Sequence, residues 1–273
     1  MTGARRVTIN AATACFPGRP VREAIESILQ GAHEPLIGRL SHAHIQLCPQ
    51  NGGQLDEAAC ERLRADYPAT QFRLHANARV LGRHVRYDAS TFGDDTKGYF
   101  FALADRSKRL GAAAYTLHAG FRRNCTLLQM IDNIKRIQDI FGEVRVGVEG
   151  LYPNERMPQL MDDWNSYHAV LDAGIPLAID LSHMAIVERA EASCDTRLLS
   201  ELLASKQTLE VHLSDNDGRH DRHDILSKAP WWWPFLTHIH DNAVVFSEGN
   251  QLNPRLTQRR TALNGVTPTP INP

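Results

Sequence analysis

The chain has 273 residues, of which 42% are hydrophobic, so it can bury a large core as one α/β barrel or as two smaller domains. Its 30 Lys and Arg residues nearly balance 31 Asp and Glu residues, and a formal net charge of −1 provides no global basic field for binding nucleic acid or an anionic membrane. No apolar run approaches the roughly eighteen residues of a membrane span, and the amino-terminal "MTGARRVTIN" lacks the apolar segment of a signal peptide.

Cysteine usage indicates the redox compartment. The five cysteines are Cys15, Cys48, Cys60, Cys125 and Cys194. Their odd number, wide spacing and lack of a C-x-x-C pair favour reduced thiols over a disulfide framework. We therefore expect a cytoplasmic protein, and the sequence leaves open whether it forms a homo-oligomer.

Short runs typical of β-strands recur along the whole chain. In chain order they are "RVTIN" (6–10), "HIQLC" (44–48), "FRLHA" (72–76), "AYTLH" (114–118), "VRVGVE" (144–149), "PLAID" (176–180), "LEVHL" (209–213) and "AVVFSE" (243–248). These runs are too apolar for a sheet with one solvated face, so we expect strands that are buried on both sides.

Helix-like stretches lie between these runs. The clearest is 126–142, where apolar residues follow helical spacing and Gly142 closes the segment. Weaker patterns predict helices over 21–31, 56–66, 97–110, 157–173, 196–205, 234–241 and 252–262. Eight strands alternating with helices indicate a single-domain (β/α)8 TIM barrel over 1–263, followed by a loose tail over 264–273. A doubly wound open sheet is the alternative, but its G-x-G-x-x-G fingerprint and a P-loop are absent.

Polar residues stand at the carboxyl ends of the predicted strands. In a (β/α)8 barrel these ends meet at one mouth, where residues distant in sequence come together. The residues are His75, His118, Glu149, Asp180, His183, His212, Asp215, Asp221, His223 and Glu248. Imidazole and carboxylate are preferred ligands of divalent metals, and several carboxylates in one mouth would repel each other without a cation. We therefore predict a divalent-metal site, for Mn, Co, Mg or Zn.

The same residues, in the same order, resemble the xylose isomerase-like TIM barrel superfamily, which includes sugar phosphate isomerases and epimerases and endonuclease IV. The most specific element is "VHLSDNDGRHDRH" (211–223), which is similar to the family's His-x-x-Asp followed by Asp-x-His. The stretches "LHAG" (117–120), "GVEG" (147–150), "IDLSH" (179–183) and "FSEG" (246–249) resemble its companion motifs. The resemblance spans nearly the whole chain.

In the isomerase and epimerase branch, the resemblance implies one divalent metal held by Glu149, Asp180, His212 and Glu248. Glu149 and Glu248 would be the catalytic acid/base pair, moving a proton next to a carbonyl through a metal-stabilised enediolate. His183 would contact the substrate. The implied function is a metal-dependent isomerase or epimerase acting on a small sugar-like or hydroxy-carbonyl substrate.

The endonuclease IV branch implies a different reaction class. Its additional zinc ligands are matched by His75, His118, His183, Asp221 and His223, and the implied activity is that of a zinc-dependent phosphoesterase. The charge balance makes a nucleic-acid partner the weaker expectation, since phosphate contacts normally leave a basic footprint. A metal-dependent oxidative or peptide-modifying barrel is a third alternative.

Two further features are candidates for substrate binding. Trp231, Trp232 and Trp233 follow the predicted ligands and could form an apolar wall against a substrate, or else pack on the barrel rim. Arg122, next to Arg123 after "LHAG", could grip a phosphate or carboxylate of the substrate, or else remain a solvated loop residue.

Overall fold

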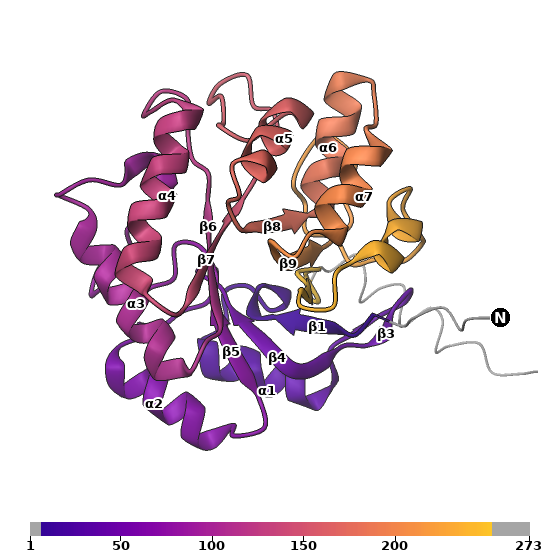
Figure 1. The fold of residues 1–273 in the computed structure, drawn as a ribbon. Helices are drawn as coiled ribbons and strands as arrows, with labels where there is room; N and C mark the ends of the chain where they lie inside the picture. Colours follow the sequence, from indigo (N-terminus) through magenta and orange to yellow (C-terminus); the bar gives the residue numbers. More distant parts are fainter. Residues whose placement is uncertain (1–6, 253–273) are drawn as a thin grey trace, which may run out of the picture.

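Eight parallel strands form a closed barrel in the computed structural model, which describes residues 7–252 (Figure 1). Around the barrel the strand order is β1-β10-β9-β8-β7-β6-β5-β4. The strands are β1 (Ile9–Ala12), β4 (Ser41–Leu47), β5 (Gln71–Leu74), β6 (Ala114–His118), β7 (Arg145–Glu149), β8 (Leu177–Asp180), β9 (Thr208–Leu213) and β10 (Val244–Ser247). The eight predicted strands and the (β/α)8 fold are confirmed, whereas the predicted barrel limits (1–263) and tail (264–273) extend beyond the described residues.

Seven α-helices surround the barrel in the described part of the chain. They are α1 (Val21–Gly31), α2 (Glu57–Asp66), α3 (Lys97–Leu110), α4 (Leu127–Phe141), α5 (Trp164–Asp172), α6 (Leu181–Glu191) and α7 (Thr196–Ala204). Helix α4 could be predicted from the sequence for two reasons. Thr126 and Gln129 form a capping box at its start, and its regularly spaced apolar side chains are buried. None of the helices within 7–252 has the length and apolar character needed to cross a membrane.

Several predicted helix limits were wrong. The helix expected over 157–173 begins only at Trp164, where Asp163 and Ser166 form a capping box. The segment expected as a helix over 234–241 is a 3-10 helix, η3 (Trp233–His238), with a proline near its start. Helix α6 and the hairpin of β2 (His33–Glu34) and β3 (Gly38–Arg39) were not predicted. The helix expected over 252–262 lies almost wholly outside the described residues.

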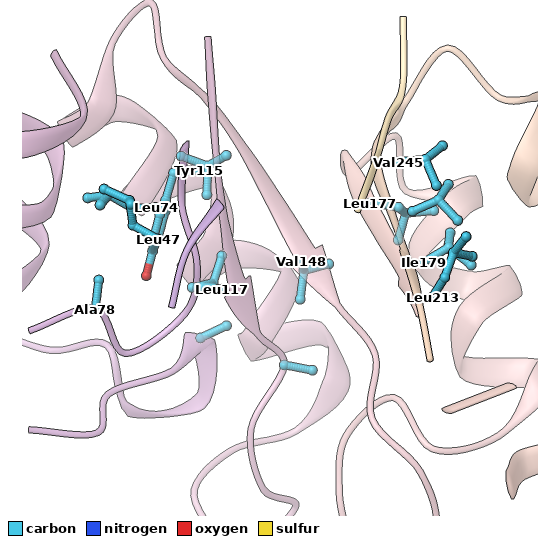
Figure 2. Close-up of a cluster of buried hydrophobic side chains, with 14 of the residues drawn as sticks. Leu47, Leu74, Ala78, Tyr115, Leu117, Val148, Leu177, Ile179, Leu213 and Val245 are labelled. Carbon is cyan, nitrogen blue, oxygen red and sulfur yellow. The ribbon is translucent and has the colours of Figure 1, made fainter. Parts of the chain in front are cut away.

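The main apolar core lies between the barrel and its helices. Figure 2 shows it as two groups of side chains, with Leu47 and Leu74 of paired strands side by side in the first and Ile179, Leu213 and Val245 in the second. All of these side chains are buried. A second, small cluster of Ala12, Ala14, Cys48 and Phe246 is separate from the main core. The apolar packing outside the barrel therefore leaves its interior free to carry polar groups.

The hairpin β2–β3 connects an early part of the chain to the last strand. Glu34 is fully buried, and its carboxylate accepts hydrogen bonds from the Leu226 amide at 2.6 Å and from the Ser247 hydroxyl. A Cβ at Gly249 would lie 2.9 Å from Glu34 Oε1 and 2.9 Å from Ile225 Cα, so the glycine of "FSEG" allows this close approach. Burial raises the pKa of Glu34 to about 7.

This burial predicts a pH-dependent contribution to stability. The folded-state pKa of Glu34 exceeds the value of 4.5 for a free glutamate, so folding takes up a proton at pH values between these two pKa values. The free energy of unfolding therefore falls as the pH rises from 5 to 8. Asp215 and the Cys15 thiol are the titratable groups that interact with Glu34. In Glu34→Gln this contribution is absent, so its free energy of unfolding relative to wild type should rise by about 2–3 kcal/mol over this range.

Urea unfolding of both proteins at pH 5, 6, 7 and 8 measures the difference. The exposed Glu201→Gln on α7 is the control and should show no such trend. A constant difference between Glu34→Gln and wild type across the range would contradict the prediction.

Candidate metal centre

Four consecutive strands bring the predicted principal ligands together. Glu149 ends β7, Asp180 ends β8, His212 lies in β9, and Glu248 directly follows β10. His212 Nδ1 lies 3.5 Å from Glu149 Oε2 and 3.9 Å from Glu248 Oε1. Oxygen atoms of Glu149 and Asp180 lie within 4.8 Å of one another in a group that includes His183. All four side chains are buried.

Two earlier histidines approach the same carboxylate. His75 Nδ1 lies 3.7 Å and His118 Nε2 lies 3.9 Å from Glu149 Oε2. His118 is held by the "LHAG" turn, where Gly120 has a positive φ of 90° and a Cβ would lie 2.3 Å from atoms of Asp88 and Ser90. The structure thus places both histidines beside Glu149, although His75 directly follows β5 and His118 ends β6.

Helix α6 supplies His183 because the helix starts directly from strand β8. Asp180 caps the helix: its Oδ1 accepts from the Ser182 amide at 2.7 Å and from the His183 amide at 3.1 Å. The other oxygen, Oδ2, lies 3.6 Å from His183 Nε2. The motif "IDLSH" is therefore a strand end and a helix cap at once, and this cap aims one carboxylate oxygen and one imidazole at the cluster.

The loop after β9 completes the cluster. Asp221 Oδ2 lies 3.5 Å from His183 Nε2 and 3.1 Å from His223 Nε2, while His223 Nδ1 lies 3.5 Å from Glu248 Oε2. The side chains of His118, Asp221 and His223 are 27%, 19% and 26% exposed, whereas the side chains of the other cluster members are 5% exposed or less. These three residues mark the solvent-facing side of the cluster.

The donor set fits a divalent cation. Among the described residues, five buried atoms of the cluster have no hydrogen-bond partner: His75 Nδ1, Glu149 Oε2, His212 Nδ1, Asp221 Oδ1 and Glu248 Oε1. Buried polar atoms are normally hydrogen-bonded, so unpartnered nitrogen and oxygen atoms that face one another need another explanation. Mixed imidazole and carboxylate donors are typical of sites for Zn²⁺, Mn²⁺ and Co²⁺.

The electrostatics of the cluster favour added positive charge. Burial acts to lower the pKa of His183, but Asp180 and Asp221 overcome this effect and raise it to about 10. Burial raises the pKa of Glu248 to about 7, and repulsion from Glu149 and Asp180 acts in the same direction. For Glu149, burial is outweighed by the histidines His212 and His75, and its pKa lies below the usual range.

Sequence reasoning missed the groups that support this cluster. Glu210, Gln46 and Arg73 are buried inside the barrel below it, and the Tyr152 ring lies 5.0 Å from the His183 ring. Glu210 stands two residues before His212, a spacing that places both side chains on one face of a strand. That spacing was the only signal in the sequence that could have identified any of them.

The structure gives the contacts of the residues that were predicted as candidates for substrate binding. Arg122 Nη2 binds the carboxylates of Asp162 at 2.5 Å and Asp163 at 3.1 Å, so its charge is already paired. Trp232 is 1% exposed and belongs to the main core, and Trp233 packs against that core from η3. Of the predicted group, only Trp231 is an exposed aromatic.

Comparison with solved structures confirms the TIM-barrel fold that the sequence predicted. A D-tagatose 3-epimerase-like protein has a TM-score of 0.64 at 14% identity, covering 94% of this chain and 96% of its own. D-allulose 3-epimerase from Methylomonas sp., in complex with D-allulose, has a TM-score of 0.61 at 13% identity, covering 95% and 90%. An AP endonuclease, family 2, from Brucella melitensis has a TM-score of 0.60 at 14% identity, covering 96% and 100%. No protein-family model and no curated protein matches the sequence.

The tryptophan positions predict contrasting effects on stability. Trp232→Ala should lower the free energy of unfolding by about 3–5 kcal/mol, because it leaves a cavity in the main core. Trp231→Ala should change it by no more than about 0.5 kcal/mol, because that side chain is 36% exposed. Chemical denaturation of the two variants measures this difference, and equal losses would contradict the assigned packing.

The cluster predicts stabilisation by divalent cations. Mn²⁺, Co²⁺ or Zn²⁺ at about one hundred times its dissociation constant should raise the free energy of unfolding by about 2.7 kcal/mol, and a chelator should reverse the effect. His212→Ala should weaken the response, because it removes the imidazole that lies between Glu149 and Glu248. His220→Ala is the matched control, because His220 is exposed in the loop after β9 and pairs with Asp217. Thermal unfolding with and without each cation is the measurement, and no response of wild type to any cation would contradict the prediction.

Proposed function

We propose that the protein is a divalent-metal-dependent isomerase or epimerase that acts on a small sugar-like or hydroxy-carbonyl substrate. One observation carries this proposal: Glu149 and Glu248 both direct a buried, unpartnered oxygen toward His212 Nδ1, although they come from different strands. The residues that would hold the cation are Glu149, Asp180, His212 and Glu248.

Two carboxylates at one centre suit proton transfer at carbon. Isomerisation and epimerisation both remove a proton next to a carbonyl group and return it elsewhere or on the other face. A bound cation would supply the positive charge that opposes the negative charge developing on the substrate oxygen. Glu149 and Glu248 would take and return the proton.

The exposed side of the cluster indicates how the substrate would approach. His118, Asp221 and His223 are its most exposed members, so a substrate would enter from their side. His183 donates from Nδ1 to the Gly150 carbonyl at 3.0 Å, which leaves Nε2 toward the cluster to orient a substrate hydroxyl. Several structures of similar fold are sugar epimerases, which supports this substrate class.

A zinc-dependent phosphoesterase is the second candidate. It is favoured by Asp221 and His223, whose contacts with His183 and Glu248 give the cluster more donors than one cation requires. An AP endonuclease of similar fold supports the same candidate. The formal net charge of −1 opposes a duplex nucleic acid as the substrate.

Glu248→Gln separates the two functions. In an isomerase, this change keeps a neutral oxygen near the cation but removes proton transfer, so turnover should fall about 100-fold or more. The measurement is deuterium exchange from solvent into C–H positions of a panel of ketoses and hydroxy acids. Wild type should exchange, whereas Glu248→Gln should stay metal-loaded and fail to exchange.

The phosphoesterase predicts the opposite pattern. Wild type would cleave a phosphodiester and exchange no C–H proton in any sugar of the panel, and Glu248→Gln would act mainly by weakening metal binding. That result would rule out the isomerase and keep the metal centre. Metal content after purification without added metal distinguishes them again, since about one Mn, Co or Mg per chain favours the isomerase and two or three Zn favour the phosphoesterase.

A further inference from the structure

A buried carboxylate lies directly below the candidate metal centre. Glu210 and His212 are both fully buried, and their separation by two residues on β9 points both side chains to one face of the strand. The pairing of β8 with β9 is irregular here: Leu177 pairs with Thr208 and Ala178 pairs with Glu210, so Leu209 is an extra residue. Such a bulge re-aims the side chains that follow it.

Glu210 is held from several sides of the barrel. Its Oε2 accepts hydrogen bonds from Gln46 Nε2 at 2.7 Å and Thr116 Oγ1 at 3.0 Å. Its Oε1 lies 3.1 Å from Arg73 Nη1, and the Arg73 side chain is 8% exposed. In the strand order, β5 is the fourth strand from β9 in either direction, so Arg73 reaches Glu210 from the opposite wall. This buried ion pair keeps Glu210 ionised and fixed in position.

The position of Glu210 determines which nitrogen of His212 carries a proton. His212 Nε2 lies 3.2 Å from Glu210 Oε2, and an ionised carboxylate can only accept a hydrogen bond, so Nε2 must be the donor. Gln46 Nε2, which donates to the same oxygen, also lies 3.0 Å from His212 Nε2, and in the Nε2–H tautomer this amide donates to Glu210 and not to the imidazole. A neutral His212 therefore has a free lone pair on Nδ1, the atom that faces Glu149 and Glu248.

We propose that Glu210 is a positioning residue for the metal centre, which holds His212 as the Nε2–H tautomer so that Nδ1 is the ligand atom. Arg73 acts through Glu210 by keeping it charged and in place. This inference rests on the proposed function, because it requires a cation at the centre. It identifies the residues that hold the ligand His212 in place. Hydrogen-bonded partners of this kind orient a ligating imidazole and strengthen it as a donor, and their loss costs about 10–100-fold in metal affinity.

Cobalt(II) binding tests the role of Glu210. The dissociation constant and visible absorption spectrum are measured for the full chain and for Glu210→Gln, in which an amide of the same size replaces the carboxylate. We expect binding about 10–100-fold weaker in Glu210→Gln, with an altered cobalt spectrum. Thr116→Val is the matched control, because it removes another donor to Glu210 but keeps the contact with His212, and it should leave the dissociation constant within about 3-fold.

A merely structural role would give a different result. Glu210→Gln would then have a lower melting temperature but the wild-type dissociation constant and cobalt spectrum in its folded form, and this outcome would overturn the inference. If Glu210→Gln does not fold, the double variant Arg73→Met/Glu210→Gln removes both buried charges together and takes its place in the cobalt titration, where the same loss of affinity is expected.

Nitrogen NMR of the His212 ring tests the tautomer itself. In zinc-loaded protein with ¹⁵N-labelled histidine, assigned with His212→Gln, we expect the proton on Nε2, and a proton on Nδ1 would overturn the inference. Wild type that binds neither cobalt nor zinc would contradict the proposed function instead. The tautomer is then measured in the metal-free protein at a pH where His212 is neutral: a proton on Nε2 supports the role of Glu210, and a proton on Nδ1 refutes it.

Discussion

Like charges held out of water at the barrel mouth are the constraint on which this structure depends. Glu149, Asp180 and Glu248 are almost fully buried, and each has an oxygen within 4.0 Å of an imidazole nitrogen of His183 or His212, an arrangement whose repulsion and desolvation must be offset by positive charge. The protein holds them there with rigid elements: the strands β7, β8 and β10, the capped start of α6, and a hairpin that fixes the end of β10. Asp180, Asp221 and Glu149 raise the pKa of His183 although its burial acts to lower it.

Much of the barrel could be predicted from the sequence because the patterns that indicate its strands are local. Strands buried on both faces give short apolar runs, and each of the eight runs became a strand of the barrel. The residues that meet at the barrel mouth could also be predicted, since parallel strands in a barrel bring their carboxyl ends together. His75 and Glu149 are far apart in sequence, yet their separation of 3.7 Å follows from their places at strand ends.

The features that were missed depend on contacts between distant segments. Helix α6 starts without a turn because Asp180 serves both strand and helix, a double role that strand patterns do not reveal. No partner for Arg122 was evident from the sequence, but Asp162 and Asp163 of the loop after β7 form ion pairs with it. Arg73 and Glu210 are 137 residues apart, and only barrel closure sets them opposite one another.

The contacts of Glu34 also bear on the order in which the molecule can assemble. This residue is synthesised early, yet its partners Leu226 and Ser247 follow 192 and 213 residues later. Contacts of such long separation require a large loss of chain entropy before they form, which slows folding. Glu248 lies beyond the last strand of the barrel, so a nascent chain cannot complete the centre until almost the whole described sequence has left the ribosome. Before that point, a cation could meet only a partial set of these ligands.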